Sequence, residues 1–102
     1  MHITIDSITD LALVVRSVRR ASNVRLDDLA ATAGVSKQFA SDVEHGKPTV
    51  QLGLVLKLLA ELGVLVKLDI PQDAVPELSV QRARGVRAPK RRSPKTTPSG
   101  VD

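Results

Sequence analysis

Apolar residues recur every three or four positions across residues 9 to 63 of this 102-residue chain. This spacing is the period of α-helices that bury one face, and it predicts a domain of four helices. Thr9 is the expected N-cap of the first helix. The inner face of that helix is apolar and its flank is basic near the C-terminal end: Leu11, Val14, Val15 and Val18 inside, Arg16, Arg19 and Arg20 on the flank.

Residues 26 to 44 predict two short helices joined by a tight turn. Gly34 ends the earlier helix, where a left-handed residue is needed, and Ser36 is placed to cap the later one. The inward positions are small or aliphatic: Leu29, Ala30 and Ala33, then Ala40 and Val43. The outer face of the later helix is polar, so we expect a polar partner there.

A fourth helix is predicted from Val50 to about Leu62, capped by Thr49 and ended by Gly63. It carries more apolar residues than one narrow stripe requires. We therefore expect it to pack against the first helix, and a second subunit is a further candidate neighbour.

Residues 64 to 70 change to the two-residue period of a β-strand, with Val64, Val66, Leu68 and Ile70 on one face. A single strand leaves its backbone hydrogen bonds unmade, so it needs a partner. The candidates are the same strand of a second chain and the alternating segment Ile3 to Ile5, within the N-terminal arm of residues 1 to 8. We favour the former, which predicts a symmetric homodimer.

Residues 71 to 102 are rich in proline, small polar residues and basic residues, and are expected to form a flexible basic tail. The formal net charge of the chain is +4, and seven of its 15 Lys/Arg residues follow residue 75. Such a tail favours polyanions, and a solubilising role is the alternative.

The chain offers little for catalysis. It has no cysteine, and its two histidines, His2 and His45, stand at the terminus and in a turn, away from any second metal ligand or serine nucleophile. We expect a non-enzyme with no cofactor, no metal and no catalytic residue. With no bilayer-length apolar run and no signal-peptide pattern, a cytoplasmic, nucleoid-associated protein is expected.

The polar outer face of the third helix suits the major groove of double-stranded DNA. Lys37 can donate to guanine O6/N7 and Gln38 can pair with adenine N6/N7, while Phe39 either packs inward or meets a thymine methyl group. Ordinary solvated helix residues are the alternative. The candidate base contacts are Ser36, Lys37, Gln38 and Ser41, with Asp42 at the margin, and the candidate phosphate contacts are Arg16, Arg20, Arg25, Lys47 and Thr49.

Small Ala30 four residues before Gly34, then Val35, Ser36, Ala40, Val43 and Glu44 followed by His45-Gly46-Lys47, resemble the helix-turn-helix of phage-repressor and Xre-type regulators. The resemblance spans Leu11 to Leu62 and implies an all-α, four-helix, lambda-repressor-like domain. It also implies a structural ion pair between Arg19 and Glu44. The chain departs from the family at Leu26, where a phosphate-holding glutamine is usual, and Arg25 is a candidate replacement.

The order of helix-turn-helix core, closing strand and flexible end is similar to HipB-type antitoxins. This likeness implies a dimer on a palindromic operator, autorepression, and a HipA-like serine/threonine kinase toxin as partner. Two other functions stay open. One is a protein-interaction module without sequence-specific DNA binding, and the other is non-specific nucleic-acid binding driven by the tail.

Overall fold

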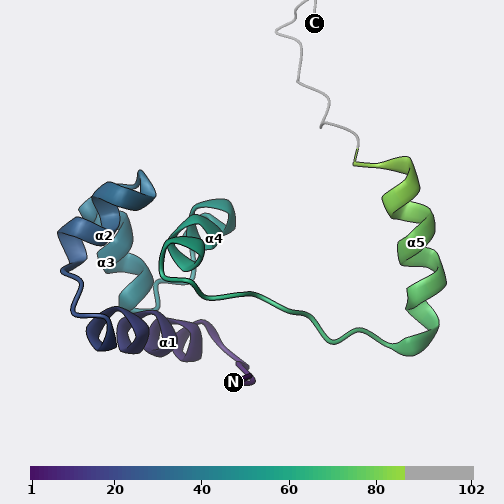
Figure 1. The fold of residues 1–102 in the computed structure, drawn as a ribbon, viewed down its shortest axis with the longest axis horizontal. Helices are drawn as coiled ribbons and strands as arrows, with labels where there is room; N and C mark the ends of the chain where they lie inside the picture. Colours follow the sequence, from purple (N-terminus) through teal and green to yellow (C-terminus); the bar gives the residue numbers. More distant parts are fainter. Residues whose placement is uncertain (87–102) are drawn as a thin grey trace, which may run out of the picture. The chain divides into compact units, whose positions relative to one another are not determined.

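The computed structural model describes residues 1–86, and five α-helices lie within them (Figure 1). Their bounds are α1 Ile8–Ala21, α2 Leu26–Ala33, α3 Lys37–Glu44, α4 Leu52–Glu61 and α5 Val75–Arg84, the last preceded by a 3-10 turn at Gln72–Ala74. The chain divides into two compact units, Met1–Lys67 with α1 to α4 and a second that begins at Leu68 and contains α5. The predicted all-α, lambda-repressor-like fold is confirmed, with one helix more than expected.

Each helix from α1 to α4 ends at a residue with positive φ: Asn23 at 57°, and Gly34, Gly46 and Gly63 at 74° each. At the end of α3, the N–H of Gly46 donates to the Val43 carbonyl (3.1 Å) and the N–H of Lys47 to the Asp42 carbonyl (3.0 Å). The same pair of bonds closes the other three helices. Four local turns therefore satisfy the last carbonyls and redirect the chain.

Two predicted helix starts are wrong and one is as expected. α1 is capped by Ser7 instead of Thr9, because the Ser7 hydroxyl accepts from the N–H of Asp10 (3.1 Å). The Asp10 carboxylate in turn accepts from the N–H of Asp6 (2.9 Å), so the backbone N–H groups of both Asp6 and Asp10 are hydrogen-bonded. Ser36 caps α3 by accepting from the N–H of Phe39 (3.0 Å), as predicted.

The start of α4 lies later than predicted, at Leu52, and its N-cap is Gln51 instead of Thr49. The turn after α3 continues through Val50, whose side chain packs against the hydrophobic core. Packing of this apolar residue therefore delays the helix past the threonine that could have capped it.

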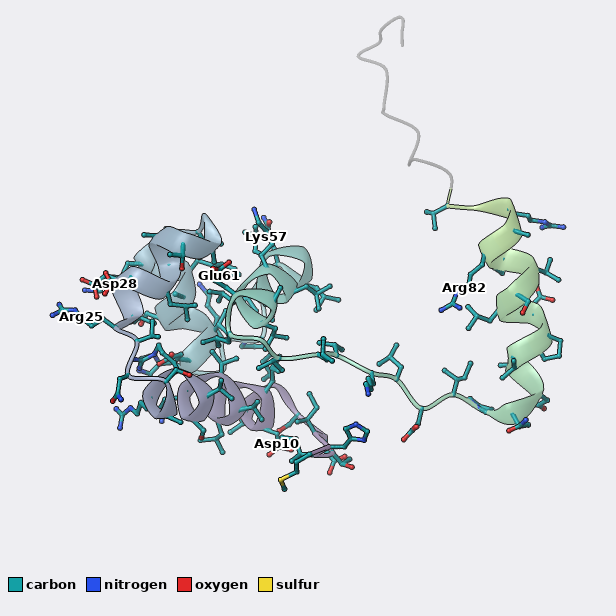
Figure 2. The ribbon with its side chains drawn as sticks, viewed as in Figure 1. Asp10, Arg25, Asp28, Lys57, Glu61 and Arg82 are labelled. Atoms are coloured by element: carbon teal, nitrogen blue, oxygen red, sulfur yellow. The ribbon has the colours of Figure 1, made fainter. Side chains whose placement is uncertain are left out.

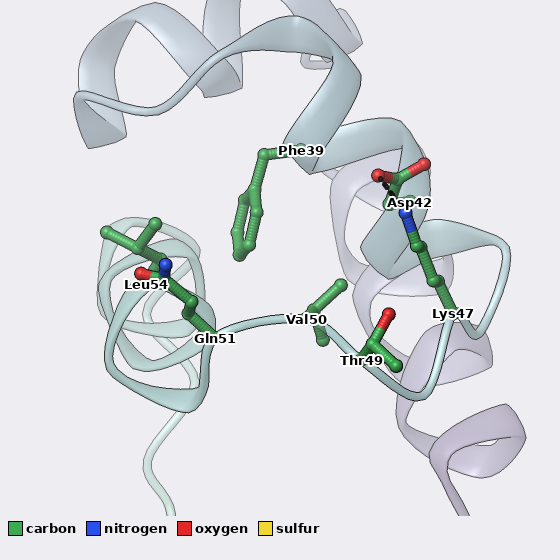
Figure 3. A pocket seen from close by; sticks show the side chains of 7 residues that line it. All are labelled: Phe39, Asp42, Lys47, Thr49, Val50, Gln51 and Leu54. Atoms are coloured by element: carbon green, nitrogen blue, oxygen red, sulfur yellow. Dashed lines mark ion pairs between the residues drawn. The ribbon is translucent and has the colours of Figure 1, made fainter.

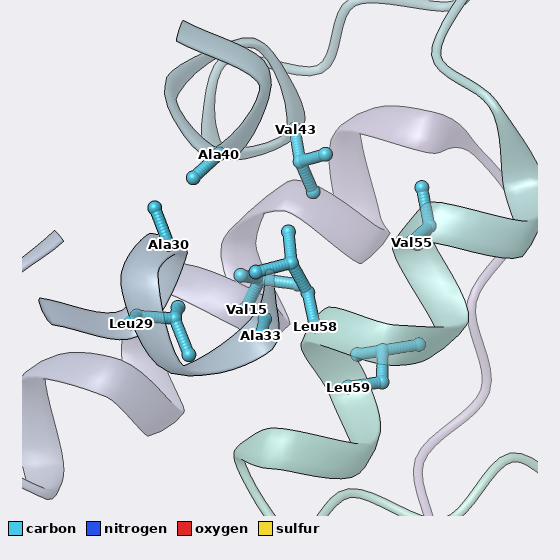
Figure 4. Close-up of a cluster of buried hydrophobic side chains, with 9 residues drawn as sticks. All are labelled: Val15, Leu29, Ala30, Ala33, Ala40, Val43, Val55, Leu58 and Leu59. Carbon is cyan, nitrogen blue, oxygen red and sulfur yellow. The ribbon is translucent and has the colours of Figure 1, made fainter. Parts of the chain in front are cut away.

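The core of the first unit joins α1 to α4 (Figure 4). The alanines Ala30 of α2 and Ala40 of α3 face each other across the helix-turn-helix, and both are buried. Small side chains at this contact let the two helices approach closely. Leu58 of α4 and Val15 of α1 are completely buried and pack beside these two alanines in the same core (Figure 4).

Within residues 1–86 no β-strand forms, and residues 64 to 70 have no regular secondary structure and follow an extended course after α4 (Figure 1). The predicted pairing across a dimer involves a second chain, so it stays a prediction. The alternative partner, the N-terminal arm, meets this segment at the side chains of Lys67 and His2, whose Nζ and Nε2 atoms lie 3.3 Å apart.

The prediction of an unstructured chain from residue 71 is wrong for Gln72–Arg84. Pro76 stands in the first turn of α5, where a missing N–H costs no helical bond. Glu77 at the start of α5, and Arg82 and Arg84 at its end, suit the helix dipole (Arg82 is labelled in Figure 2). Composition alone did not separate these helix signals from a proline-rich tail. The remainder of the predicted basic tail, residues 87–102, lies outside the described residues.

Candidate nucleic-acid interface

The outer face of α3 presents the four candidate base contacts at its N-terminal half. Ser36, Lys37 and Gln38 are exposed, and Ser41 one turn later is half-buried. The opposite face carries Ala40 and Val43, neither with any exposed surface. α3 is thus fixed from behind by α2 and α1 while its polar N-terminal end faces solvent.

Asp42 links two of the side chains on this face. Its Oδ1 accepts from the Nε2 of Gln38 (2.9 Å), one helical turn earlier, and its Oδ2 lies 3.6 Å from the Nζ of Lys47. The Asp42 carboxylate therefore joins a candidate base contact to a candidate phosphate contact. Sequence reasoning placed Asp42 only at the margin, although its i, i+4 spacing from Gln38 is visible in the chain.

A shallow, open cavity of about 220 Å³ lies beside α3, between that helix and the start of α4 (Figure 3). The Phe39 ring points toward Leu54 and Val50 on its apolar side. Asp42, Lys47, Thr49 and Gln51 form the polar side. Phe39 packs against the core and is half-buried, so its packing role is observed, and one edge of its ring borders the open cavity.

Arg19 and Glu44 form a two-point ion pair between α1 and α3. The Nε of Arg19 bonds Glu44 Oε2, and its Nη2 donates to Oε1 (2.9 Å). A third donor of Arg19 bonds the carbonyl of Val24 (3.0 Å). Glu44 is buried, and its hydrogen bond raises the pKa of Arg19 further above its ordinary value.

The five candidate phosphate contacts have different surroundings. Arg16 donates to the backbone carbonyl of Glu44, so part of its guanidinium is occupied in holding the end of α3. Arg20 is exposed, and so is Thr49. Arg25, exposed at the start of α2 near Asp28 in Figure 2, pairs with Asp27 at 3.5 Å. The pKa of Asp27 is lowered mainly by a hydrogen bond from its own backbone and next by the hydrogen bond from Arg25.

The position of Leu26 gives a physical reason for its departure from the glutamine that is usual in the family. Its side chain is half-buried and packs against the hydrophobic core at the first residue of α2. A polar phosphate-holding residue is thereby replaced by an apolar one that adds to the domain interior. Arg25 beside it keeps a cation at the same helix start.

Two further observations concern other kinds of site. Across residues 1–86, no three His, Asp or Glu side chains gather where they would hold a metal ion. None of the helices in this part of the chain is both long and apolar enough to cross a bilayer.

Comparison with known proteins extends this picture. A family model described as helix-turn-helix matches residues 15–66. An uncharacterized HTH-type transcriptional regulator, y4mF of Sinorhizobium fredii (strain NBRC 101917 / NGR234), is 45% identical over 62 residues, which cover 61% of this chain and 82% of that protein.

Solved structures of HipB complexes have a similar fold. A chain from a HipA-HipB-O2-O3 complex aligns with a TM-score of 0.64 at 24% identity, covering 70% of this chain and 100% of its own. A chain from a HipB-O1-O2 complex aligns with a TM-score of 0.63 at 25% identity, covering 68% and 100% respectively.

Proposed function

The chain belongs to the helix-turn-helix family, and on this premise we propose that it is a sequence-specific DNA-binding repressor of transcription. One observation carries the proposal: α3 projects Ser36, Lys37 and Gln38 into solvent while its opposite face is completely buried. A rigidly backed helix with a polar N-terminal end fits the DNA major groove, where such residues reach base edges.

The repressor acts as a homodimer joined through residues 64 to 70. This segment is extended, and Leu68 is 82% exposed with Val66 at 54%. Exposed apolar side chains on an extended backbone are suited to pairing with the same segment of a second copy. The resulting two-fold symmetry sets two α3 helices about one DNA turn, roughly 34 Å, apart, so the operator is palindromic.

Repression follows from occupancy of that operator, and the protein controls its own synthesis in the cytoplasm, at the nucleoid. Its partner is a HipA-like serine/threonine kinase toxin, whose binding adjusts operator occupancy. Support for this partner comes from the similarity of fold to a chain of a HipA-HipB complex. No catalytic step belongs to this chain's own role.

The alternative is a protein-interaction module that has lost DNA binding. The observation that favours it is Leu26, which removes a polar residue from the start of α2. A third possibility, non-specific binding by the tail, depends on charges that lie mostly among residues 87–102, outside the described residues.

Selection of bound DNA from a random pool, at near-physiological salt, tests the proposal. We expect the full chain to enrich a palindrome, and the Lys37→Ala/Gln38→Ala variant to lose that preference while keeping weak non-specific binding. Equal retention of unselected DNA by both proteins would favour the tail-driven or interaction-module function. The toxin partner is tested separately, by co-purification with the product of the adjacent gene.

A further inference from the structure

We infer that Asp42 determines which base Gln38 recognises, because the Asp42 carboxylate occupies one of the two N–H donors of the Gln38 side-chain amide. Gln38 then pairs with adenine and rejects guanine. This inference rests on the proposed function, since it concerns how α3 distinguishes bases once it lies in the groove.

The geometry on the outer face of α3 fixes the amide in one orientation. Gln38 Nε2 donates to Asp42 Oδ1 at 2.9 Å. The opposite orientation would bring the amide oxygen against a carboxylate, and two acceptors repel each other. Gln38 is exposed, so without this bond its amide would rotate freely in solvent.

A count of donors shows the consequence for recognition. A glutamine amide has two N–H donors and one carbonyl acceptor. With one donor bound to Asp42, one donor and one acceptor are left for DNA. Adenine presents an acceptor at N7 and a donor at N6, which match this pair. Guanine presents acceptors at N7 and O6, so its O6 would face the glutamine oxygen.

Lys47 holds the carboxylate in position from the other side. Its Nζ lies 3.6 Å from Asp42 Oδ2, and its backbone N–H donates to the Asp42 carbonyl at 3.0 Å. The side chain of Asp42 is 24% exposed, which limits its freedom to swing away from Gln38. The two oxygens of Asp42 thus have separate partners, one directed at a base contact and one at a phosphate contact.

The alternative role for this pair is stabilisation of α3 alone, since Gln and Asp at i, i+4 stabilise any helix slightly. If the bond only stabilised α3, its removal would lower the affinity for every DNA sequence equally. The inferred role changes the preference at one base position, so the experiment measures that preference.

The experiment uses the full chain and the palindrome that the wild-type protein selects. The base position at which the Gln38→Ala variant loses its preference is made either adenine or guanine. The wild-type protein is expected to bind the adenine site roughly 5- to 100-fold more tightly. Asp42→Ala should reduce that ratio to about threefold or less, because both amide donors become free. Asp42→Asn should give an intermediate ratio, because its amide can either accept from Gln38 through Oδ1 or donate to the Gln38 oxygen through Nδ2.

Glu61→Gln, at the exposed end of α4 (Figure 2), removes the same charge without touching α3 and should leave the ratio unchanged. An unchanged ratio in Asp42→Ala overturns the inference, and so does an equal fall of the ratio in Glu61→Gln, which would assign the effect to net charge. If Asp42→Ala does not fold, Asp42→Ser, whose hydroxyl falls short of the amide, takes its place. Failure of the wild-type protein to select any site overturns the proposed function and this inference together; failure of the ratio test alone overturns only the inference.

Discussion

Arg19 and Glu44 stand 25 residues apart in the chain and form a two-point ion pair that joins the end of α1 to the end of α3. Glu44 is nearly inaccessible to solvent, and the side chain of Arg19 is 13% exposed. The pair therefore fixes the C-terminal end of the helix that carries the candidate base contacts.

Glu44→Ala should lower the free energy of unfolding by about 3–5 kcal/mol, because it leaves the Arg19 guanidinium buried without its partner. Chemical denaturation measures this. Adding Arg19→Met should recover part of the loss, and independent, additive effects of the two substitutions would argue that the pair does not act as a unit.

The contribution of Arg19 to stability should be constant near neutral pH. A raised pKa in the folded state stabilises fully at pH values below the unfolded pKa and is lost only as pH rises through the folded one. For arginine both values lie far above neutrality. Unfolding free energies of wild type and Arg19→Met, measured from pH 6 to 9, should therefore differ by the same amount throughout.

Ala40→Leu should destabilise the first unit by about 1–3 kcal/mol, since Ala40 is completely buried where α3 meets α2 and a larger side chain overpacks the contact. Thermal unfolding measures the change. The control is Ala31→Leu on the exposed face of α2, where the same enlargement should have little effect. Equal melting temperatures for the two variants would contradict tight packing at Ala40.

Asn23→Ala should cost about 1–2 kcal/mol, because Asn23 adopts a left-handed conformation (φ 57°) at the end of α1 that alanine tolerates poorly. Asn23→Gly should be neutral or slightly stabilising at the same position. Denaturation of both variants gives the comparison. Similar losses in both would mean that the asparagine side chain, and not the backbone, matters.

Leu68→Lys should raise the dissociation constant of the proposed homodimer about 100-fold, because each dimer would lose two apolar side chains from the pairing proposed for residues 64 to 70. Sedimentation measures the dimer population against concentration. Asp69→Lys places the same cation on the polar face of the segment and should have a much smaller effect. If both variants dimerise like the wild type, the interface lies elsewhere.

Local signals made most of the first unit predictable. Ser36 and Gly34 act through bonds to neighbours within five residues, so sequence alone located them. Thr9 was wrong as the N-cap of α1, because the Ser7 hydroxyl two residues earlier accepts from the N–H of Asp10, and the Asp10 carboxylate accepts from the N–H of Asp6. The helix within 72–84 was missed because the proline-rich composition from residue 71 onward favours disorder, whereas Pro76 lies in the first turn of α5, where proline is tolerated.

The interactions around the candidate site depend on how separate segments meet, and that limits prediction. Glu44 and Arg19 were paired only by family resemblance, since nothing in their spacing shows contact. The Gln38–Asp42 bond follows from helix geometry, but the approach of Lys47 depends on the left-handed turn at Gly46.

The four left-handed helix ends also have a kinetic consequence. Each is closed by bonds between residues no more than five apart, so the chain changes direction without waiting for distant segments to meet. Proteins dominated by such local contacts fold on timescales of roughly microseconds to milliseconds. We expect the helices of Met1–Lys67 to assemble within each chain soon after synthesis, so that folding and the proposed pairing of two copies would be separate, successive events.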